Sequence, residues 1–273
     1  MVSFDVTSLF TNVPITTACT LIRKHWAHIQ PNSPLDVEAF IEGILLCTEA
    51  TVIQYQNKFY RQIFGCPMGS ALSGALANLV MIDLEHEALL TIPPQAIRVY
   101  TRYVDDIFSI LRKIYLQRLL DALNGYHERL QFTVENEANK CLPFLDVLVS
   151  HDQLGIHTTV YVKPTSSHRY LDFFSPSPPQ HKYATARSLL ARAFYFPDNF
   201  HEQTTQLKVW TNILGSNNYP ASYIQCILLN LHQAVMPQAL RPFTALPAPL
   251  DAAVTTPTQW IAIPYVQQIH KRL

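Results

Sequence analysis

Two adjacent aspartates, Asp105 and Asp106, lie between two runs of β-branched and aromatic residues, and this pattern constrains the fold more than any other stretch. Ile97–Tyr103 precedes the pair and Ile107–Leu111 follows it. Such runs are typical of β-strands, so the aspartates are predicted to lie in the tight turn of a hairpin. Like charges held together there raise each other's pKa unless a cation neutralises them. Oxygen ligands suit a hard cation such as Mg²⁺, although two aspartates are also an ordinary turn sequence.

A third carboxylate stands near the start of the chain. Asp5 lies inside the short apolar run Ser3–Phe10, which is predicted to be the first strand. An aspartate inside such a strand needs a partner or a metal; alternatively, it lies on an edge strand or caps the following helix. Paired with the hairpin, Asp5 completes the minimal set of carboxylates for a two-metal phosphoryl-transfer site.

A glycine-containing loop, Gly65–Gly69, leads into a segment of small residues. Small side chains allow a base pair or a phosphate to approach the backbone closely. The loop is not a P-loop, because no Gly-Lys-Ser/Thr follows it. The alternative is a helix that packs through a face of small residues.

These three segments resemble motifs A, B and C of reverse transcriptases, and their amino-acid sequences are similar to those of the same motifs in Penelope-like retroelement polymerases. The resemblance runs in the family's order over most of residues 1–195, and it is carried by Phe4–Pro14, Pro67–Ser70 with Ala77-Asn78, Tyr103–Asp106, Phe132–Glu135, Leu142–Asp146, and Tyr161–Thr165 with Tyr170-Leu171. It implies an RNA-directed DNA polymerase that extends a DNA primer on an RNA template with deoxynucleoside triphosphates. It also implies two Mg²⁺ ions, replaceable by Mn²⁺, held by Asp5, Asp105 and Asp106, with Asp5 and Asp105 as the more direct ligands.

The resemblance also implies roles in substrate binding. Phe10 stands at the family's steric gate against ribonucleotides, or it is simply a core residue. Gly69, Ser70 and Ala71 are predicted to line the pocket for the nascent base pair. Lys140 is either a general acid for pyrophosphate or a solvated loop lysine, and Lys163 either contacts primer phosphate or caps a strand end.

The expected fold class is α+β: an antiparallel palm sheet with helices on one face, followed by a helical thumb. Residues 1–164 are assigned to a palm without fingers, 165–236 to the thumb, and 237–273 to a partly disordered connector rich in proline and alanine. The patterns predict helices over residues 16–29, 35–50, 70–90, 115–130, 181–195, 200–214 and 219–235, a strand over 131–135, and hairpins over 51–63 and 144–162.

Net charge, hydropathy and cysteine content limit the classes of protein to which this chain can belong. The formal net charge of zero argues weakly against a large nucleic-acid surface. No apolar run reaches the length of a membrane span, and no basic segment precedes an apolar one at the start, so neither a membrane anchor nor a signal peptide is expected. The five cysteines show no metal-ligand spacing, which predicts reduced thiols and a nuclear or cytoplasmic protein that is not secreted.

Two interpretations stay open at this stage. The three carboxylates and Phe10 favour a catalytic palm and thumb, a fragment of a larger reverse transcriptase. The expected lack of a fingers region favours a non-catalytic, truncated retroelement remnant that binds nucleic acid weakly or not at all.

Overall fold

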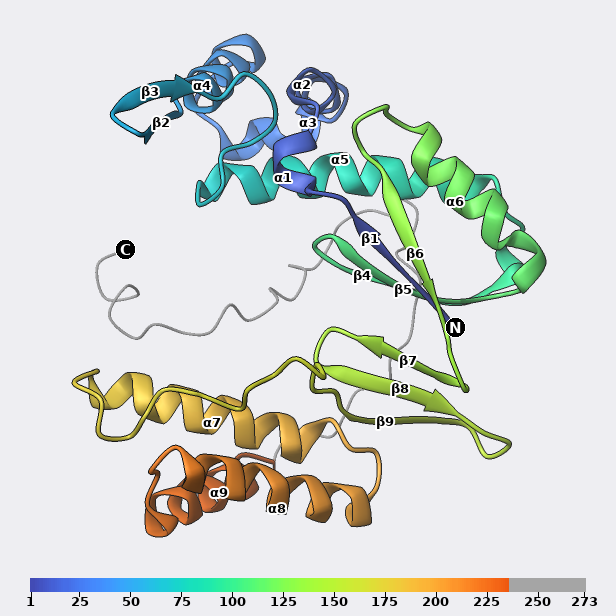
Figure 1. Cartoon of the computed structure of the whole chain (residues 1–273). Coiled ribbons are helices and arrows are strands. Elements are labelled where there is room, and N and C mark those ends of the chain that lie inside the picture. Colours follow the sequence, from blue (N-terminus) through green and yellow to red (C-terminus); the bar gives the residue numbers. More distant parts are fainter. Residues whose placement is uncertain (236–273) are drawn as a thin grey trace. The chain divides into compact units, whose positions relative to one another are not determined.

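The core of the protein is a four-stranded antiparallel sheet with the strand order β4-β5-β1-β6. The computed structural model describes residues 1–235 (Figure 1), so the predicted connector over 237–273 lies outside the described residues. The sheet consists of β1 (Val2–Val6), β4 (Ile97–Tyr103), β5 (Asp106–Leu111) and β6 (Phe132–Asn136). The predicted α+β class and the predicted hairpin around Asp105 and Asp106 are confirmed.

Alternation along β1 divides the sheet into two different faces. Val2, Phe4 and Val6 are buried, whereas Ser3 is half-buried and Asp5 is exposed. The buried side chains pack on the long helix α5 (Ala71–Leu90), on α6 (Leu116–Gly125) and on α2 (Ile15–Lys24). Because side chains on a strand alternate between faces, the helices cover one face and the carboxylate of Asp5 is directed to the other.

A smaller unit of helices and one hairpin connects β1 to α5. It comprises α1 (Leu9–Asn12), α3 (Trp26–Ile29), α4 (Val37–Glu49), β2 (Val52–Tyr55) and β3 (Lys58–Arg61). Asp36 caps α4 by accepting hydrogen bonds from the backbone N–H groups of Glu38 and Ala39 at 3.0 and 2.9 Å. The predicted turn of the β2–β3 hairpin is confirmed: Gln56 and Asn57 both have positive φ, as in a type I′ turn.

A separate three-stranded sheet packs on the face of the central sheet that carries Asp5. It consists of β7 (Cys141–Phe144), β8 (Val147–His151) and β9 (Ile156–Val160). Phe108 of β5 packs with Leu142 and Val149 in one hydrophobic cluster, and its ring lies 5.5 Å from the ring of Phe144. This contact covers part of the face and leaves the end with Asp5 and Asp106 open.

Three helices follow, and they match the predicted thumb helices. They are α7 (Pro179–Tyr195), α8 (Phe200–Ser216) and α9 (Ala221–Val235). Their core is built from apolar side chains such as Leu190, Trp210 and Ile227, and Val160 at the end of β9 belongs to the same cluster. None of the helices within residues 1–235 has both the length and the hydropathy needed to cross a membrane.

Three predicted element boundaries were wrong at the ends of helices and strands. The first strand ends at Val6 rather than Phe10, because Ser8 adopts a positive φ of 52° and α1 begins directly after it. The helix predicted over 16–29 is divided at His25 into α2 and α3. The helix predicted over 115–130 ends at Gly125, where the side chain of Gln131 donates to the carbonyls of Asn124, His127 and Glu128 instead of continuing the helical ladder.

The strand β7 was missed: the sequence patterns predicted no element over residues 136–143 and began the next hairpin at Phe144. The observed chain turns at Leu145-Asp146, between β7 and β8. Pro143 is tolerated inside β7 because β7 is an edge strand of its sheet, where one row of N–H groups is not needed for pairing.

We predict that Gly65→Ala destabilises the fold strongly, whereas Gly74→Ala does not. A Cβ at Gly65 would collide with the carbonyl oxygen of Thr11 and lie 2.7 Å from that of Phe10, and its φ is +72°. The expected loss is about 2–4 kcal/mol in the free energy of unfolding. Gly74 lies inside α5 with open space around it, so alanine there should stabilise by roughly 0.5–1 kcal/mol. Urea titration of both variants measures the difference, and equal midpoints would contradict the tight contact between α1 and the Gly65 loop.

Candidate active site

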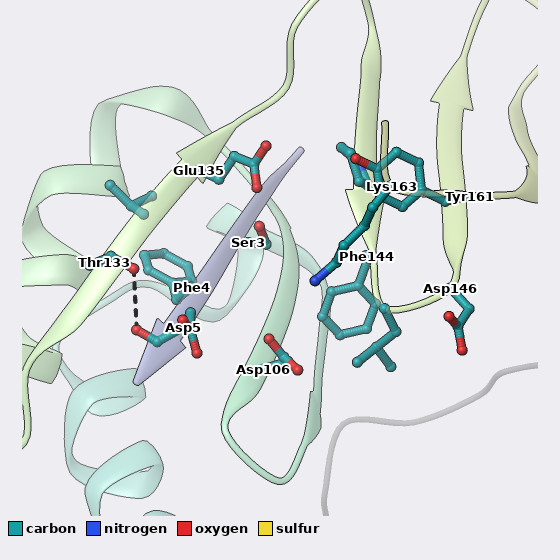
Figure 2. Close-up of a pocket in the computed structure, with 13 residues that line it drawn as sticks. Ser3, Phe4, Asp5, Asp106, Thr133, Glu135, Phe144, Asp146, Tyr161 and Lys163 are labelled. Atoms are coloured by element: carbon teal, nitrogen blue, oxygen red, sulfur yellow. Dashed lines mark hydrogen bonds between the residues drawn. The ribbon is translucent and has the colours of Figure 1, made fainter. Parts of the chain in front are cut away.

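The strand register brings Asp5 and Asp106 together. The two residues are direct cross-strand partners in the antiparallel pairing of β1 with β5. Residues directly opposite each other present their side chains on the same face, with Cβ atoms roughly 4.5–5.5 Å apart. Figure 2 shows both carboxylates directed into the same open space. Asp105 precedes Asp106 and lies in the two-residue turn between β4 and β5.

The turn that carries Asp105 is strained. Val104, its first residue, has a φ of 58°, in the left-handed region that a β-branched residue rarely adopts. Arg102 holds this turn: its guanidinium donates to the carbonyl of Val104 at 3.0 Å and to the side-chain oxygen of Asn78 at 3.0 Å. The same guanidinium forms an ion pair with Glu85 at 2.9 Å. Asn78 and Glu85 both belong to α5, so this helix positions the turn that carries Asp105 through one arginine.

The carboxylates open onto a pocket of about 560 Å³ between the central sheet and the three-stranded sheet. Among the described residues, Asp5, Asp106, Glu135 and Asp146 supply four carboxylates to its lining, and Lys163 supplies one cationic side chain. Figure 2 shows the Lys163 amine extending toward Asp106. The remaining lining residues are Ser3, Phe4, Thr133, Val134, Pro143, Phe144, Leu145 and Tyr161.

Burial and mutual repulsion both raise the pKa values of Asp5 and Asp106. Although Asp5 is exposed as a whole residue, partial burial raises the pKa of its carboxyl, and the charge of Asp105 raises it further. Burial likewise raises the pKa of Asp106, with Asp105 and Asp5 adding to the effect and Lys163 opposing it. The site therefore holds negative charge that a bound cation would stabilise.

The donor set fits Mg²⁺ only with help from a substrate. Within residues 1–235, no group of three or more His, Cys, Asp or Glu side chains is arranged as a metal centre by itself. Mg²⁺ is commonly held by one or two carboxylates together with substrate phosphates and water. The facing oxygens of Asp5 and Asp106, with Asp105 beside them, match that incomplete kind of site.

The other predicted site residues fall into two groups. Lys163 lines the pocket. Phe10 lies in α1, half-buried against the main core, and Gly69, Ser70 and Ala71 form the start of α5, where Ser70 accepts a hydrogen bond from the N–H of Leu72. Lys140 lies in the turn that follows β6. The last residue of β6, Asn136, pairs with Val2, and Val2 lies at the opposite end of β1 from Asp5. The structure thus does not bring Lys140 to the pocket.

Three titratable residues of the pocket lining received no role from sequence reasoning: Glu135, Asp146 and Tyr161. Glu135 shares the face of Asp5, because it pairs with Ser3 two positions earlier on β1. Asp146 lies in the β7–β8 turn and forms an ion pair with Arg192 of α7 at 3.0 Å. All three occur in the segments that carry the family resemblance, and that occurrence was the signal available for finding them.

Comparisons with known proteins support this architecture at the level of fold. No protein-family model and no curated protein matches the chain at a significant level. The structure is similar to that of telomerase from Candida albicans in complex with a TWJ fragment of telomeric RNA, with a TM-score of 0.53 and 11% identity over 84% of this chain and 40% of the telomerase. It is also similar to the Sicinivirus 3Dpol RNA-dependent RNA polymerase, with a TM-score of 0.51 and 16% identity over 86% of this chain and 51% of the polymerase.

The chain has a reverse-transcriptase-like polymerase fold. It spans about half the length of these structures or less. The fold explains why the carboxylates lie where β1 meets the β4–β5 turn, on the sheet face that the long helices leave uncovered.

We predict that Asp105→Asn raises the thermal midpoint at pH 7 and that the gain shrinks toward pH 3. Because the pKa values of Asp5 and Asp106 are raised in the folded protein, protonation of these carboxyls stabilises the folded state. This stabilisation is fully present at pH values below the pKa of an unfolded aspartate. It is lost as pH rises through the higher folded values. Asparagine removes a repelling charge and reduces that loss.

Differential scanning calorimetry at pH 3, 5 and 7 measures this effect. Asp121→Asn is the matched control, because Asp121 is an exposed carboxylate of α6 that accepts a hydrogen bond from Gln117, outside the pocket. A lower midpoint for Asp105→Asn than for wild type at pH 7 would show that repulsion does not govern this cluster.

Proposed function

We propose that this chain is the palm and thumb of an RNA-directed DNA polymerase, which transfers deoxynucleotides to a primer 3′-hydroxyl. The observation that carries the proposal is the β1–β5 register, which sets Asp5 directly across from Asp106 with Asp105 in the adjoining turn. The polymerase fold and the open pocket in front of these residues support it. The resemblance of the motif sequences to those of Penelope-like retroelement polymerases favours an RNA template over a DNA template.

Asp5, Asp105 and Asp106 would hold two Mg²⁺ ions, with Mn²⁺ as a substitute. When bound, the ions make the primer hydroxyl a better nucleophile and neutralise charge on the triphosphate and pyrophosphate. The carboxylates of this chain supply the negative charge for that binding, and Lys163 stands on the opposite wall of the pocket, where its amine can pair with a phosphate. Glu135 extends the carboxylate row along the same face of the sheet.

The partners in this proposal are an RNA template, a DNA primer and deoxynucleoside triphosphates, in the nucleus or the cytoplasm. Residues 1–164 would form the palm and 165–236 the thumb. Gly69, Ser70 and Ala71 would line the base-pair pocket at the exposed start of α5.

One observation favours the alternative of a non-catalytic remnant. The described pocket has four carboxylates and a single lysine in its lining. A triphosphate carries several negative charges, and polymerase-type sites balance them with metals and with additional cationic side chains. A chain that lacks these side chains would keep the fold and lose turnover.

We predict that Asp105→Asn abolishes primer extension while the protein stays folded. The substitution removes a negative charge that would hold the metal ions, so their stabilisation of charge on the reacting phosphates is lost, and losses of such electrostatic stabilisation are typically about a hundred-fold or more. Extension of a DNA primer on an RNA template with deoxynucleotides, in Mg²⁺ and separately in Mn²⁺, measures the change. Asp121→Asn should extend at the wild-type rate. A folded wild-type protein that never extends the primer would support the remnant instead.

We predict that Phe10→Ala admits ribonucleotides. A bulky ring five residues after Asp5 would exclude a ribose 2′-hydroxyl, and alanine would leave space for it. The ratio of ribonucleotide to deoxynucleotide incorporation in single-nucleotide extension measures selectivity. Phe10 also packs against the main core, so Leu72→Ala, which removes another partly buried side chain of that core, controls for loss of stability. Unchanged selectivity in a folded Phe10→Ala protein would leave Phe10 as a core residue only.

A further inference from the structure

The β2–β3 hairpin exposes an unusual density of large apolar side chains. All eight residues of its two strands are exposed, including Ile53, Tyr55 and Phe59 with 58%, 63% and 74% of their surface accessible. In Figure 1 the hairpin projects beyond the end of α4. An isolated two-stranded hairpin is marginally stable in water, and exposed apolar clusters of this kind mark interaction surfaces.

The register sorts these side chains onto two faces. Ile53 pairs with Tyr60, and Tyr55 pairs with Lys58, so these four side chains share one face. Gln54 pairs with Phe59, and Val52 pairs with Arg61, on the opposite face. Each face therefore combines at least one aromatic ring with one basic group.

The charge of the hairpin is one-sided. Residues 51–63 contain Lys58 and Arg61 and no acidic residue, in a chain whose formal net charge is zero. Directly after the hairpin, the guanidinium of Arg129 lies 4.0 Å from the ring centre of Phe64. The local excess of positive charge is complementary to a polyanion.

The same charge disfavours a second copy of this chain as the occupant. A two-fold contact places the same patch on both partners, so Lys58 and Arg61 would face their own copies. Exposed aromatic rings with interleaved basic residues are instead the arrangement that binds unpaired bases and backbone phosphates.

We propose that the β2–β3 hairpin binds single-stranded nucleic acid, with Tyr55 and Tyr60 stacking on bases and Lys58, which shares their face, contacting phosphate. The hairpin runs through Phe64 into the Gly65–Ser70 loop, whose Cys66 N–H donates to the carbonyl of Phe10 at 2.6 Å. It is thus continuous with the segment assigned to the nascent base pair. This inference rests on the proposed function and adds to it a nucleic-acid surface outside the carboxylate pocket.

The test measures equilibrium binding of the full chain to a fluorescein-labelled oligonucleotide of about 12 nucleotides, within the range that one binding module covers. Anisotropy is recorded without Mg²⁺ and without deoxynucleotides, so that catalysis does not contribute. RNA and DNA single strands of one sequence, and the corresponding duplex, are compared. Both single strands should bind more tightly than the duplex, and their ratio shows which sugar is preferred.

Two variants separate stacking from charge. Tyr55→Ala/Tyr60→Ala should weaken binding by roughly ten-fold or more, whereas Tyr55→Phe/Tyr60→Phe should bind as wild type, because phenylalanine keeps the ring. Lys58→Ala should weaken binding and reduce the slope of log affinity against log salt by about 0.7, the value for one phosphate contact on a single strand. Phe200→Ala and Arg112→Ala/Lys113→Ala alter an exposed aromatic and an exposed basic pair elsewhere, and they should leave both quantities unchanged.

The outcomes distinguish this inference from the proposed function. Hairpin variants that are folded by circular dichroism and bind like wild type overturn the inference, even if wild type extends primers. If the hairpin variants lose binding and the wild-type protein never extends a primer, the inference is supported and the proposed catalysis is overturned. A wild-type dimer that becomes monomeric in the hairpin variants, with nucleic-acid affinity unchanged, would show that the hairpin is a contact between copies.

Discussion

The site depends on the antiparallel pairing of β1 with β5. Phe4 and Ile107 are partners on the buried face of this pairing, and Asp5 and Asp106 are the next partners on the open face. A slip of one residue would exchange the faces, placing Asp5 in the core and Phe4 in water. The hydrophobic core therefore fixes the position of the carboxylates: the free energy that buries Phe4 also holds two repelling charges within a few ångströms of each other.

The second sheet and the long helix complete that arrangement from opposite sides. Helix α5 reaches the turn of Val104 and Asp105 through Asn78, Glu85 and the guanidinium of Arg102. The three-stranded sheet packs on the open face through the contact of Phe144 with Phe108 of β5, and Lys163, which follows β9, lines the pocket. Rigid elements on both sides keep the carboxylates in place before any substrate binds, which is what transition-state stabilisation by fixed charges requires.

Local sequence patterns identified most of the elements, and long-range contacts decided the rest. Two hairpins, the helix α5 and the three C-terminal helices follow from alternation, apolar periodicity and turn residues, and the meeting of Asp5 with the aspartate pair follows from reading two strands as neighbours. Glu135 could not be placed by such reasoning, because it reaches the pocket through the pairing of β1 with β6. Strand β7 was missed because Pro143 is acceptable only on an edge, and edge position is a tertiary property. The predicted roles of Phe10, Lys140 and Lys163 depend on a bound nucleotide and stay predictions.

Two turns at the pocket share a feature with a thermodynamic consequence. Val104 and Leu145 both have positive φ, 58° and 53°, and both expose 43% of their surface where glycine would fit without strain. Such conformations cost of order 1–3 kcal/mol each, against a total stability of about 5–15 kcal/mol for a typical domain. The native state thus carries a reserve of strain beside its carboxylates. A ligand that buries these two exposed apolar side chains gains hydrophobic free energy on binding, and one that lets either φ relax also recovers the strain, so binding would stabilise the folded protein.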